Sequence, residues 1–357
     1  MGFRSHGFRN HSEAAAGAAV QSTLRELHAA ADKVLDHEPL GRADAAILLG
    51  EILSEAGLPA GVVNIIAGPG ALTGEALTSH PDVRMISFTG SAEIGRRLLA
   101  VSSKSPIIKK VILELGGKGP FIAEEDCDIV GAVNSLVVGF CLMQGEVCCA
   151  STRLFLHERI YERFMEKLVK RVRSLRFGDI LDPETQIGSL ISREQLQSVD
   201  RCVQEAIAGG ARLVCGGEPY TEPPCDKGNH YKPTILEQVT NDMKCAQEEI
   251  FGPVLVVIRY KDLDEAIAMA NDNCYALGAT FWSNDPKKLF YASRKLDAGI
   301  VWLNTNVMSK IEAPYGGNKN SGLGREDGTI GIKEYLKVKN NVLFIAKEYD
   351  NFYNFQD

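Results

Sequence analysis

Apolar residues recur at a helical period in some stretches of the chain and form short continuous runs in others. A first helix is predicted over residues 45–57, where it ends at a glycine followed closely by a proline. The other predicted helices cover residues 92–100, 129–140, 160–175, 192–208 and 264–271, and the predicted strands cover residues 62–66, 85–88, 111–115, 212–215, 254–260, 279–282 and 299–304. Because strands alternate with helices, the sequence predicts an α/β fold with a parallel sheet.

Two further boundaries follow from the same pattern. A second α/β domain is expected to begin near Gly116, after the strand over residues 111–115. Beyond Glu326 the pattern predicts one more helix and a final strand over residues 341–345.

Composition narrows the class of protein. The chain has 357 residues, which suggests two domains at about 150 residues each. Apolar residues make up 45% and charged residues 24%, a balance that argues against a disordered chain or a coiled coil. The net charge of −7 argues against nucleic-acid partners. The longest apolar run, residues 136–143, is far shorter than the ~18 residues that span a bilayer, so no membrane partner is expected.

The nine cysteines bear on metal binding and on location. Their scattered spacings fit neither a zinc site nor a small disulfide-bonded scaffold, so no metal is expected. An odd number of cysteines favours free thiols in a reducing compartment. The first residues of the chain lack the apolar core of a secretory signal. We therefore expect a cytoplasmic protein.

Cys148 is a candidate nucleophile at the end of the predicted helix over residues 129–140. Taken alone, it is read more simply as a buried structural thiol, which is the commoner fate of a cysteine in an apolar stretch. Glu114 is likewise read more simply as a carboxylate at a strand edge. Other parts of the sequence favour a catalytic role for both.

Five short motifs occur in order along the chain. They are Phe88-Thr89-Gly90-Ser91, Leu113-Glu114-Leu115-Gly116-Gly117-Lys118, Gly145-Glu146-Val147-Cys148, Glu248-Glu249-Ile250-Phe251-Gly252-Pro253 and Pro314-Tyr315-Gly316-Gly317-Asn318-Lys319-Asn320-Ser321-Gly322. Through them the sequence resembles the NAD(P)-dependent aldehyde dehydrogenase superfamily, from about Ala45 to the C-terminus.

The resemblance implies an oxidoreductase that converts an aldehyde to a carboxylic acid with NAD(P)⁺ and water. Cys148 matches the nucleophile, which forms a thiohemiacetal and then a thioester. Glu114 matches the general base that activates water for hydrolysis of the thioester. Its presence favours hydrolysis over acyl transfer to coenzyme A, because that transfer needs no water-activating base.

Four positions match cofactor-binding residues of the family. Gly90 and Ser91 match a turn at a helix N-terminus whose backbone amides accept the pyrophosphate. Glu249 matches the acid that holds the nicotinamide-side ribose, and Phe251 the ring beside the nicotinamide. The implied cofactor is NAD, with NADP also open. Without the resemblance, Glu249 and Phe251 would be read as an acid at a helix start and a core aromatic.

The remaining implied site residues concern protons and substrate. Glu326 matches an acid that supports proton release, although a solvated acid after a turn explains it equally well. Val147, Cys149 and Tyr315 match the substrate pocket, and core packing is the simpler explanation for each. Tyr315 could face a cation, which narrows the small-molecule substrate to betaine aldehyde or an aminoaldehyde. Three more pocket positions are Leu142, Val307 and Ser309.

The resemblance also implies a domain organisation. Residues 1–44 form an atypical N-terminal segment and residues 45–116 a partial, Rossmann-like cofactor domain. Residues 117–325 form the catalytic domain, and residues 326–357 a tail with an oligomerisation strand. A homo-oligomer is therefore expected.

The chain departs from the family pattern in three places. It has no Pro-Trp-Asn-Phe/Tyr-Pro motif, whose asparagine helps bind the oxyanion. His37 and Leu40 stand where a lysine and a glutamate hold the adenosine ribose. Dinucleotide affinity is therefore expected to be lower by about one to two decades. Glu146 replaces the usual glutamine, and a carboxylate there would oppose thiolate formation at Cys148.

These departures leave two alternatives to the enzyme. One is a catalytically impaired, truncated homologue with a structural role in an oligomer. The other is an esterase that uses Cys148 and Glu114 and needs no cofactor.

Overall fold

The computed structural model describes residues 42–179 and 181–345. The chain divides into two compact units, one up to Val83 and one from Arg84 onward. His37 and Leu40 lie outside the described residues. Within the described residues, no helix is both long and apolar enough to cross a membrane.

The described part of the first unit is helical. The predicted helix is confirmed as α2 (Arg42–Glu55), and α3 (Gly70–Ser79), which was not predicted, begins directly after Pro69. The strand predicted over residues 62–66 is wrong, because those residues have irregular backbone. Val62 and Ile66 are 63% and 59% exposed, and the described part of this unit holds no strand with which their backbone could pair.

A small sheet opens the second unit. Its strands β1 (Met85–Thr89) and β2 (Lys110–Glu114) are parallel and are joined by α4 (Ala92–Lys104), as the sequence predicts. The short β12 (Gly322–Leu323) returns from far along the chain and pairs antiparallel with β2. Residues near position 322 are thereby brought beside Glu114.

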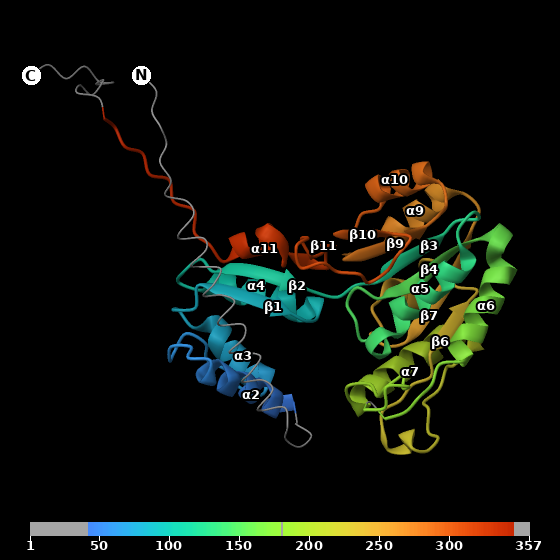
Figure 1. Ribbon diagram of the computed structural model, residues 1–357, viewed down its shortest axis with the longest axis horizontal. Coiled ribbons are helices and arrows are strands. Elements are labelled where there is room, and N and C mark those ends of the chain that lie inside the picture. Colours follow the sequence, from blue (N-terminus) through green and yellow to red (C-terminus); the bar gives the residue numbers. More distant parts are fainter. Residues whose placement is uncertain (1–41, 180, 346–357) are drawn as a thin grey trace, which may run out of the picture. The chain divides into compact units, whose positions relative to one another are not determined.

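A seven-stranded sheet forms the largest part of the second unit (Figure 1). In spatial order the strands are β10 (Ile300–Leu303), β9 (Gly278–Trp282), β3 (Gly119–Ala123), β4 (Ser151–His157), β7 (Val254–Tyr260), β6 (Thr234–Glu237) and β5 (Arg212–Cys215). All neighbouring pairs are parallel except β5 and β6. The predicted parallel sheet is confirmed, and β3, β4 and β6 are strands that the pattern did not predict.

The missed central strands are buried on both faces. Along β3, Phe121 and Ala123 pack into one apolar core, while Ile122 packs into the other. Every residue of β3 and β4 is buried, so neither strand shows the polar and apolar alternation that marks a strand with one exposed face.

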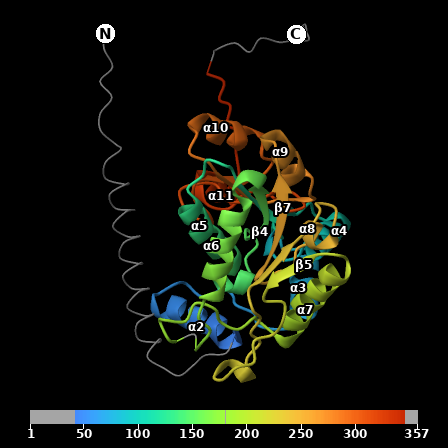
Figure 2. The ribbon, with the colours of Figure 1, turned by 90° about the vertical axis from the view of Figure 1, so that its right-hand side faces the viewer.

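Helices cover the two faces of this sheet. The core that contains Phe121 also contains residues of α5 (Ile129–Cys141) and α6 (Tyr161–Arg173), which lie side by side (Figure 2). The core that contains Ile122 includes residues of α7 (Arg193–Ala208), α9 (Leu263–Asn271) and α10 (Pro286–Lys295). The predicted helices at α5, α6, α7 and α9 are confirmed.

The remaining elements are short. They are η1 (Leu142–Gly145), η2 (Glu158–Ile160), η3 (Cys225–Lys227), α8 (Lys244–Gln247), β8 (Tyr275–Ala276), β11 (Asn318–Lys319) and α11 (Gly328–Glu334). The helix predicted after Glu326 is confirmed as α11. The strand predicted over residues 341–345 is wrong, since these residues pair with no strand of the described chain, and Val342 is 87% exposed.

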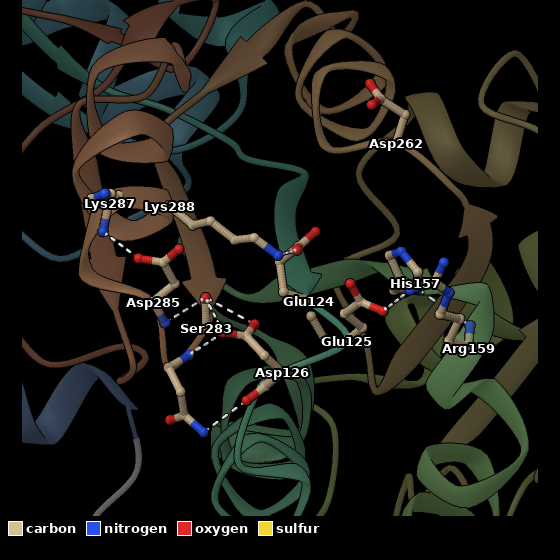
Figure 3. A network of polar contacts seen from close by, with 12 residues as sticks. Glu124, Glu125, Asp126, His157, Arg159, Asp262, Ser283, Asp285, Lys287 and Lys288 are labelled. Carbon is tan, nitrogen blue, oxygen red and sulfur yellow. Dashed lines mark hydrogen bonds and ion pairs between the residues drawn. The ribbon is translucent and has the colours of Figure 1, made fainter.

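A polar network fixes the loop that follows β3 (Figure 3). The carboxylate of Asp126 accepts hydrogen bonds from the Ser283 hydroxyl at 2.9 Å and from the backbone N–H of Asn284 at 3.1 Å. Glu124, which is 3% exposed, accepts from Tyr260 Oη at 2.7 Å and forms an ion pair with Lys288 of α10. The ends of β3 and β9 are thereby tied together.

We expect Asp126→Ala to lower the free energy of unfolding by about 2 kcal/mol, because it leaves a buried hydroxyl and a backbone amide without an acceptor. Urea unfolding measures the change. Glu125→Ala is the control, because Glu125 forms an exposed ion pair with Arg159, and its loss should leave stability nearly unchanged. Equal effects of the two substitutions would show that the loop is not held through Asp126.

Candidate active site

Cys148 lies in a turn between η1 and the first residue of β4. Its Sγ is 3.6 Å from the hydroxyl oxygen of Tyr315. The pKa of the Cys148 thiol is lowered to about 6, first by a hydrogen bond with the Cys149 thiol and then by the one with Tyr315, while burial opposes this change. Near neutral pH, Cys148 is therefore largely a thiolate, the reactive form of cysteine.

Glu114 is the last residue of β2 and is 3% exposed. Neither oxygen of its carboxylate has a hydrogen-bond partner among the described residues. Its pKa is raised to about 8, first by burial and then by the negative charges of Glu326 and Cys148. Near neutral pH, Glu114 is therefore largely an uncharged acid.

Two glycines that follow Glu114 allow the chain to pass close to Cys148 and Glu249, two other residues predicted for the site. A Cβ atom on Gly117 would lie 2.1 Å from the carbonyl oxygen of Cys148, and one on Gly116 would lie 2.3 Å from Oε2 of Glu249. The backbone N–H of Gly117 also donates to Oε1 of Glu249 at 2.8 Å. The strand end can pass between Cys148 and Glu249 only because these two residues lack side chains.

Glu249 and Phe251 lie on the segment that follows α8. Burial raises the pKa of the Glu249 carboxyl. Phe251 is 38% exposed and has a φ of 57°, a backbone conformation that is uncommon outside glycine. The amide of Gln195 on α7 donates to the Phe251 carbonyl at 2.7 Å, which helps to hold this segment.

Gly90 and Ser91 form the turn between β1 and α4, as predicted. Ser91 caps the helix, since its hydroxyl accepts from the backbone N–H of Ile94 at 3.3 Å. The N–H of Gly90 donates to the carbonyl of Glu114 at 3.0 Å. The amides of Gly90 and Ile94 are therefore both already engaged within the chain.

Tyr315 and Glu326 are held opposite each other by two backbone hydrogen bonds of 2.8 Å. Tyr315, Val147 and Val307 pack against a small apolar cluster that consists of Cys149, Leu277 and Trp302. The predicted pocket residues Val147, Cys149 and Tyr315 thus lie together beside Cys148. Leu142 is 43% exposed and does not belong to this cluster.

Glu146, two residues before Cys148, binds a distant backbone amide. Both of its carboxylate oxygens accept from the backbone N–H of Ile191 at 3.1 Å. The pKa of Cys148 is nonetheless lowered, and its main causes are Cys149 and Tyr315. The hydrogen bonds from Cys149 and Tyr315 therefore outweigh the effects that oppose the thiolate.

Two charged residues near the site were missed by sequence reasoning. Arg325 donates to the carbonyls of Gly317 at 2.9 Å and Gly324 at 2.7 Å, and its charge counteracts the rise in the pKa of Glu114. Lys118 is 2% exposed, and its Nζ has no hydrogen-bond partner among the described residues. Lys118 ends one of the five motifs and Arg325 lies three residues beyond the last of them, and neither position indicated that the side chain would lie near the site.

The arrangement combines a thiol whose pKa is lowered, a buried carboxyl and a small apolar cluster. A thiolate can add to a carbonyl carbon and later leave from it. A carboxyl of raised pKa, once ionised, can take a proton from water. Together these groups suit the formation and hydrolysis of a thioester.

Comparison with known proteins agrees with this chemistry. The model of the aldehyde dehydrogenase family matches residues 41–341. An NADP-dependent succinate-semialdehyde dehydrogenase of Escherichia coli is 42% identical over 83% of this chain and 60% of its own length. A human 4-trimethylaminobutyraldehyde dehydrogenase is 40% identical over 83% of this chain and 60% of its own length.

Solved structures give the same result. The NAD-dependent aldehyde dehydrogenase of Sinorhizobium meliloti is 38% identical, with a TM-score of 0.83 over 86% of this chain and 60% of that one. The chain spans about 60% of the length of the curated relatives it matches. The family match covers more than half of the chain, and we conclude that this chain belongs to the aldehyde dehydrogenase family.

Proposed function

We propose that this chain oxidises an aldehyde to a carboxylic acid with NAD(P)⁺ and water. The observation that carries the proposal is the pairing of Cys148, whose pKa is lowered, with Glu114, whose pKa is raised, at one site. Residues 45–116 would form the cofactor-binding part and residues 117–325 the catalytic part. A cytoplasmic homo-oligomer, assembled through residues 326–357, belongs to the same proposal.

The nicotinamide end of the cofactor fits the residues present. The Glu249 carboxylate is oriented by the Gly117 amide and would hold the ribose hydroxyls. Phe251, which is 38% exposed, would lie against the nicotinamide, and Ser91 begins the helix that would receive the pyrophosphate. When bound, NAD(P)⁺ supplies a hydride acceptor.

Cys148 would carry the covalent chemistry. Its thiolate adds to the aldehyde carbon and forms a C–S bond, while the carbonyl oxygen takes the negative charge of a thiohemiacetal. Loss of hydride from that carbon leaves a thioester on Cys148. The Tyr315 hydroxyl lies 3.6 Å from Sγ and would orient the thiolate before the attack.

Glu114 would act after the thioester has formed. The thiolate charge of Cys148 contributes to the raised pKa of Glu114, and a thioester carries no charge. Acylation would therefore lower the pKa of Glu114 and favour its carboxylate at the step that needs a base. Glu114 then takes a proton from water, and the hydroxide displaces the thiolate of Cys148 as the carboxylic acid forms.

We further propose that the aldehyde substrate is betaine aldehyde or an aminoaldehyde. The aromatic ring of Tyr315 beside Cys148 supports it, since a cation can lie against such a ring. The similarity to 4-trimethylaminobutyraldehyde dehydrogenase and to a betaine aldehyde dehydrogenase of Bacillus subtilis, which is 40% identical, agrees with it. Succinate semialdehyde, an anion, is the informative comparison substrate.

Reduced cofactor formed from NAD⁺ or NADP⁺ with each aldehyde tests the proposed function directly. We expect turnover that requires Cys148 and that favours the cationic aldehydes over succinate semialdehyde. Ester hydrolysis without any cofactor-dependent oxidation would support the esterase instead. A folded chain that does neither would support a structural role.

Iodoacetamide should alkylate Cys148 faster than the other eight thiols at pH 7, because its lowered pKa makes it a thiolate there. The labelling rate should rise with pH to half its maximum near pH 6. Peptide mapping by mass spectrometry measures this, and Cys148→Ser should abolish the fast phase. Faster labelling of Cys149 or Cys245 would remove Cys148 as the nucleophile.

Glu114→Gln should slow hydrolysis of the thioester by roughly 10²–10⁴-fold, because water loses its base. With a nitrophenyl ester as acyl donor, the initial burst should persist while steady turnover falls. In the parent chain the hydrolysis rate should rise with pH, with a midpoint below the pKa of about 8 that Glu114 has beside the free thiolate. Glu184→Gln, on an exposed ion pair with Arg176, is the control. An unchanged steady rate in Glu114→Gln would assign the base to another group.

A further inference from the structure

The turn that leads to Cys148 has an unfavourable backbone. Met143 and Gln144 have φ values of 47° and 57°, and both lie in the left-handed region that side-chain-bearing residues seldom adopt. Gly145 continues the same conformation with a φ of 75°. Such a backbone persists only where surrounding contacts hold it.

The side chain of Gln144 makes two of these contacts. Its Oε1 accepts from the backbone N–H of Gly188 at 3.0 Å, and its Nε2 donates to the carbonyl of Ser189 at 3.3 Å. A single amide group therefore binds both a donor and an acceptor on one distant segment.

Glu146, two residues further on, binds the same segment. Both of its carboxylate oxygens lie 3.1 Å from the backbone nitrogen of Ile191. Gln144 and Glu146 thus flank Gly145 and attach both sides of the strained turn to residues 188–191.

Residues 188–191 are themselves firmly placed. Leu190 is 3% exposed and its N–H donates to the carbonyl of Asn229 at 3.0 Å. In return, the N–H of Asn229 donates to the Ser189 hydroxyl at 2.9 Å. The segment can therefore serve as a fixed support.

We propose that Gln144 and Glu146 are positioning residues that form a nucleophile clamp, which fixes the turn before Cys148 against residues 188–191. The clamp keeps the Cys148 sulfur within reach of the Cys149 thiol and the Tyr315 hydroxyl. The inference rests on the proposed role of Cys148 as nucleophile, and it gives Glu146 a role that its charge alone did not suggest.

The strain in the turn explains why the clamp matters for reactivity. When the side chains of Gln144 and Glu146 are removed, the backbone at residues 143 and 144 can relax toward ordinary φ values. Cys148 then moves relative to Tyr315. Since hydrogen bonds from Cys149 and Tyr315 favour the thiolate, their loss returns the thiol toward its ordinary ionisation.

The test is the pH dependence of Cys148 alkylation in the double variant Gln144→Ala/Glu146→Ala of the full chain. We expect the midpoint to move upward, the rate at pH 7 to fall about tenfold, and the limiting rate at high pH to stay close to that of the parent. A midpoint equal to the parent's, in a variant that still unfolds cooperatively, would overturn the proposal.

Two further variants separate positioning from general stability. Glu146→Gln keeps an oxygen acceptor for the Ile191 amide, so its alkylation midpoint should equal that of the parent. Glu146→Ala removes the acceptor, so its midpoint should be higher. Gln204→Ala is the matched control, because Gln204 on α7 also makes two hydrogen bonds, to Gly217 and Asp200, away from Cys148. If the double variant does not fold, the same measurement is made on Glu146→Ala alone. An alkylation midpoint that stays at the parent value in that variant overturns the proposal.

Alkylation needs neither cofactor nor aldehyde, so this test is independent of the proposed function. A shifted midpoint in a chain that oxidises no aldehyde supports the clamp and contradicts the function. An unshifted midpoint in a chain that does oxidise aldehydes supports the function and overturns the clamp.

Discussion

The site depends on the absence of two side chains at the end of β2. At Gly117 a methyl group would lie 2.1 Å from the carbonyl oxygen of Cys148, and at Gly116 one would lie 2.3 Å from the Glu249 carboxylate. Any other residue there would separate the strand from the nucleophile turn or from the acidic segment. Because Glu114 is only three residues before Gly117, the same close approach brings its carboxyl within electrostatic reach of the Cys148 thiol. The electrostatic coupling between them follows from that backbone contact.

The coupling gives the site an order of events. With Cys148 ionised, Glu114 stays uncharged, so two negative charges do not have to be buried together. In the proposed reaction, acylation would remove the sulfur charge and so lower the pKa of the Glu114 carboxyl. Burial, the largest cause of the raised pKa of Glu114, is present in both states and keeps water access limited. In the proposed function, the thiol and the carboxyl would therefore act in sequence without any change in fold.

Sequence predicted the elements that have one exposed face and a clear period, such as α4 and α5. It missed β3 and β4, which are buried on both faces, and it wrongly gave strands to residues 62–66 and 341–345, because an apolar run does not reveal whether a partner strand exists. For the site, motif order predicted Cys148 and Glu114 as neighbours. It could not predict that Glu146 turns to Ile191, since that contact joins segments 45 residues apart.

The contacts that set the reactivity of Cys148 all lie in the second unit of the chain, between β2 and Glu326. The acylation and hydrolysis that we propose would use these residues. The proposed oxidation needs a dinucleotide in addition. The sequence resemblance assigns its adenosine end to His37 and Leu40, which lie outside the described residues. Neither leucine nor a mostly neutral imidazole can replace a lysine and a glutamate as ribose ligands. We therefore expect covalent chemistry at Cys148 and affinity for the cofactor to be separable by experiment, because the first would not require the second.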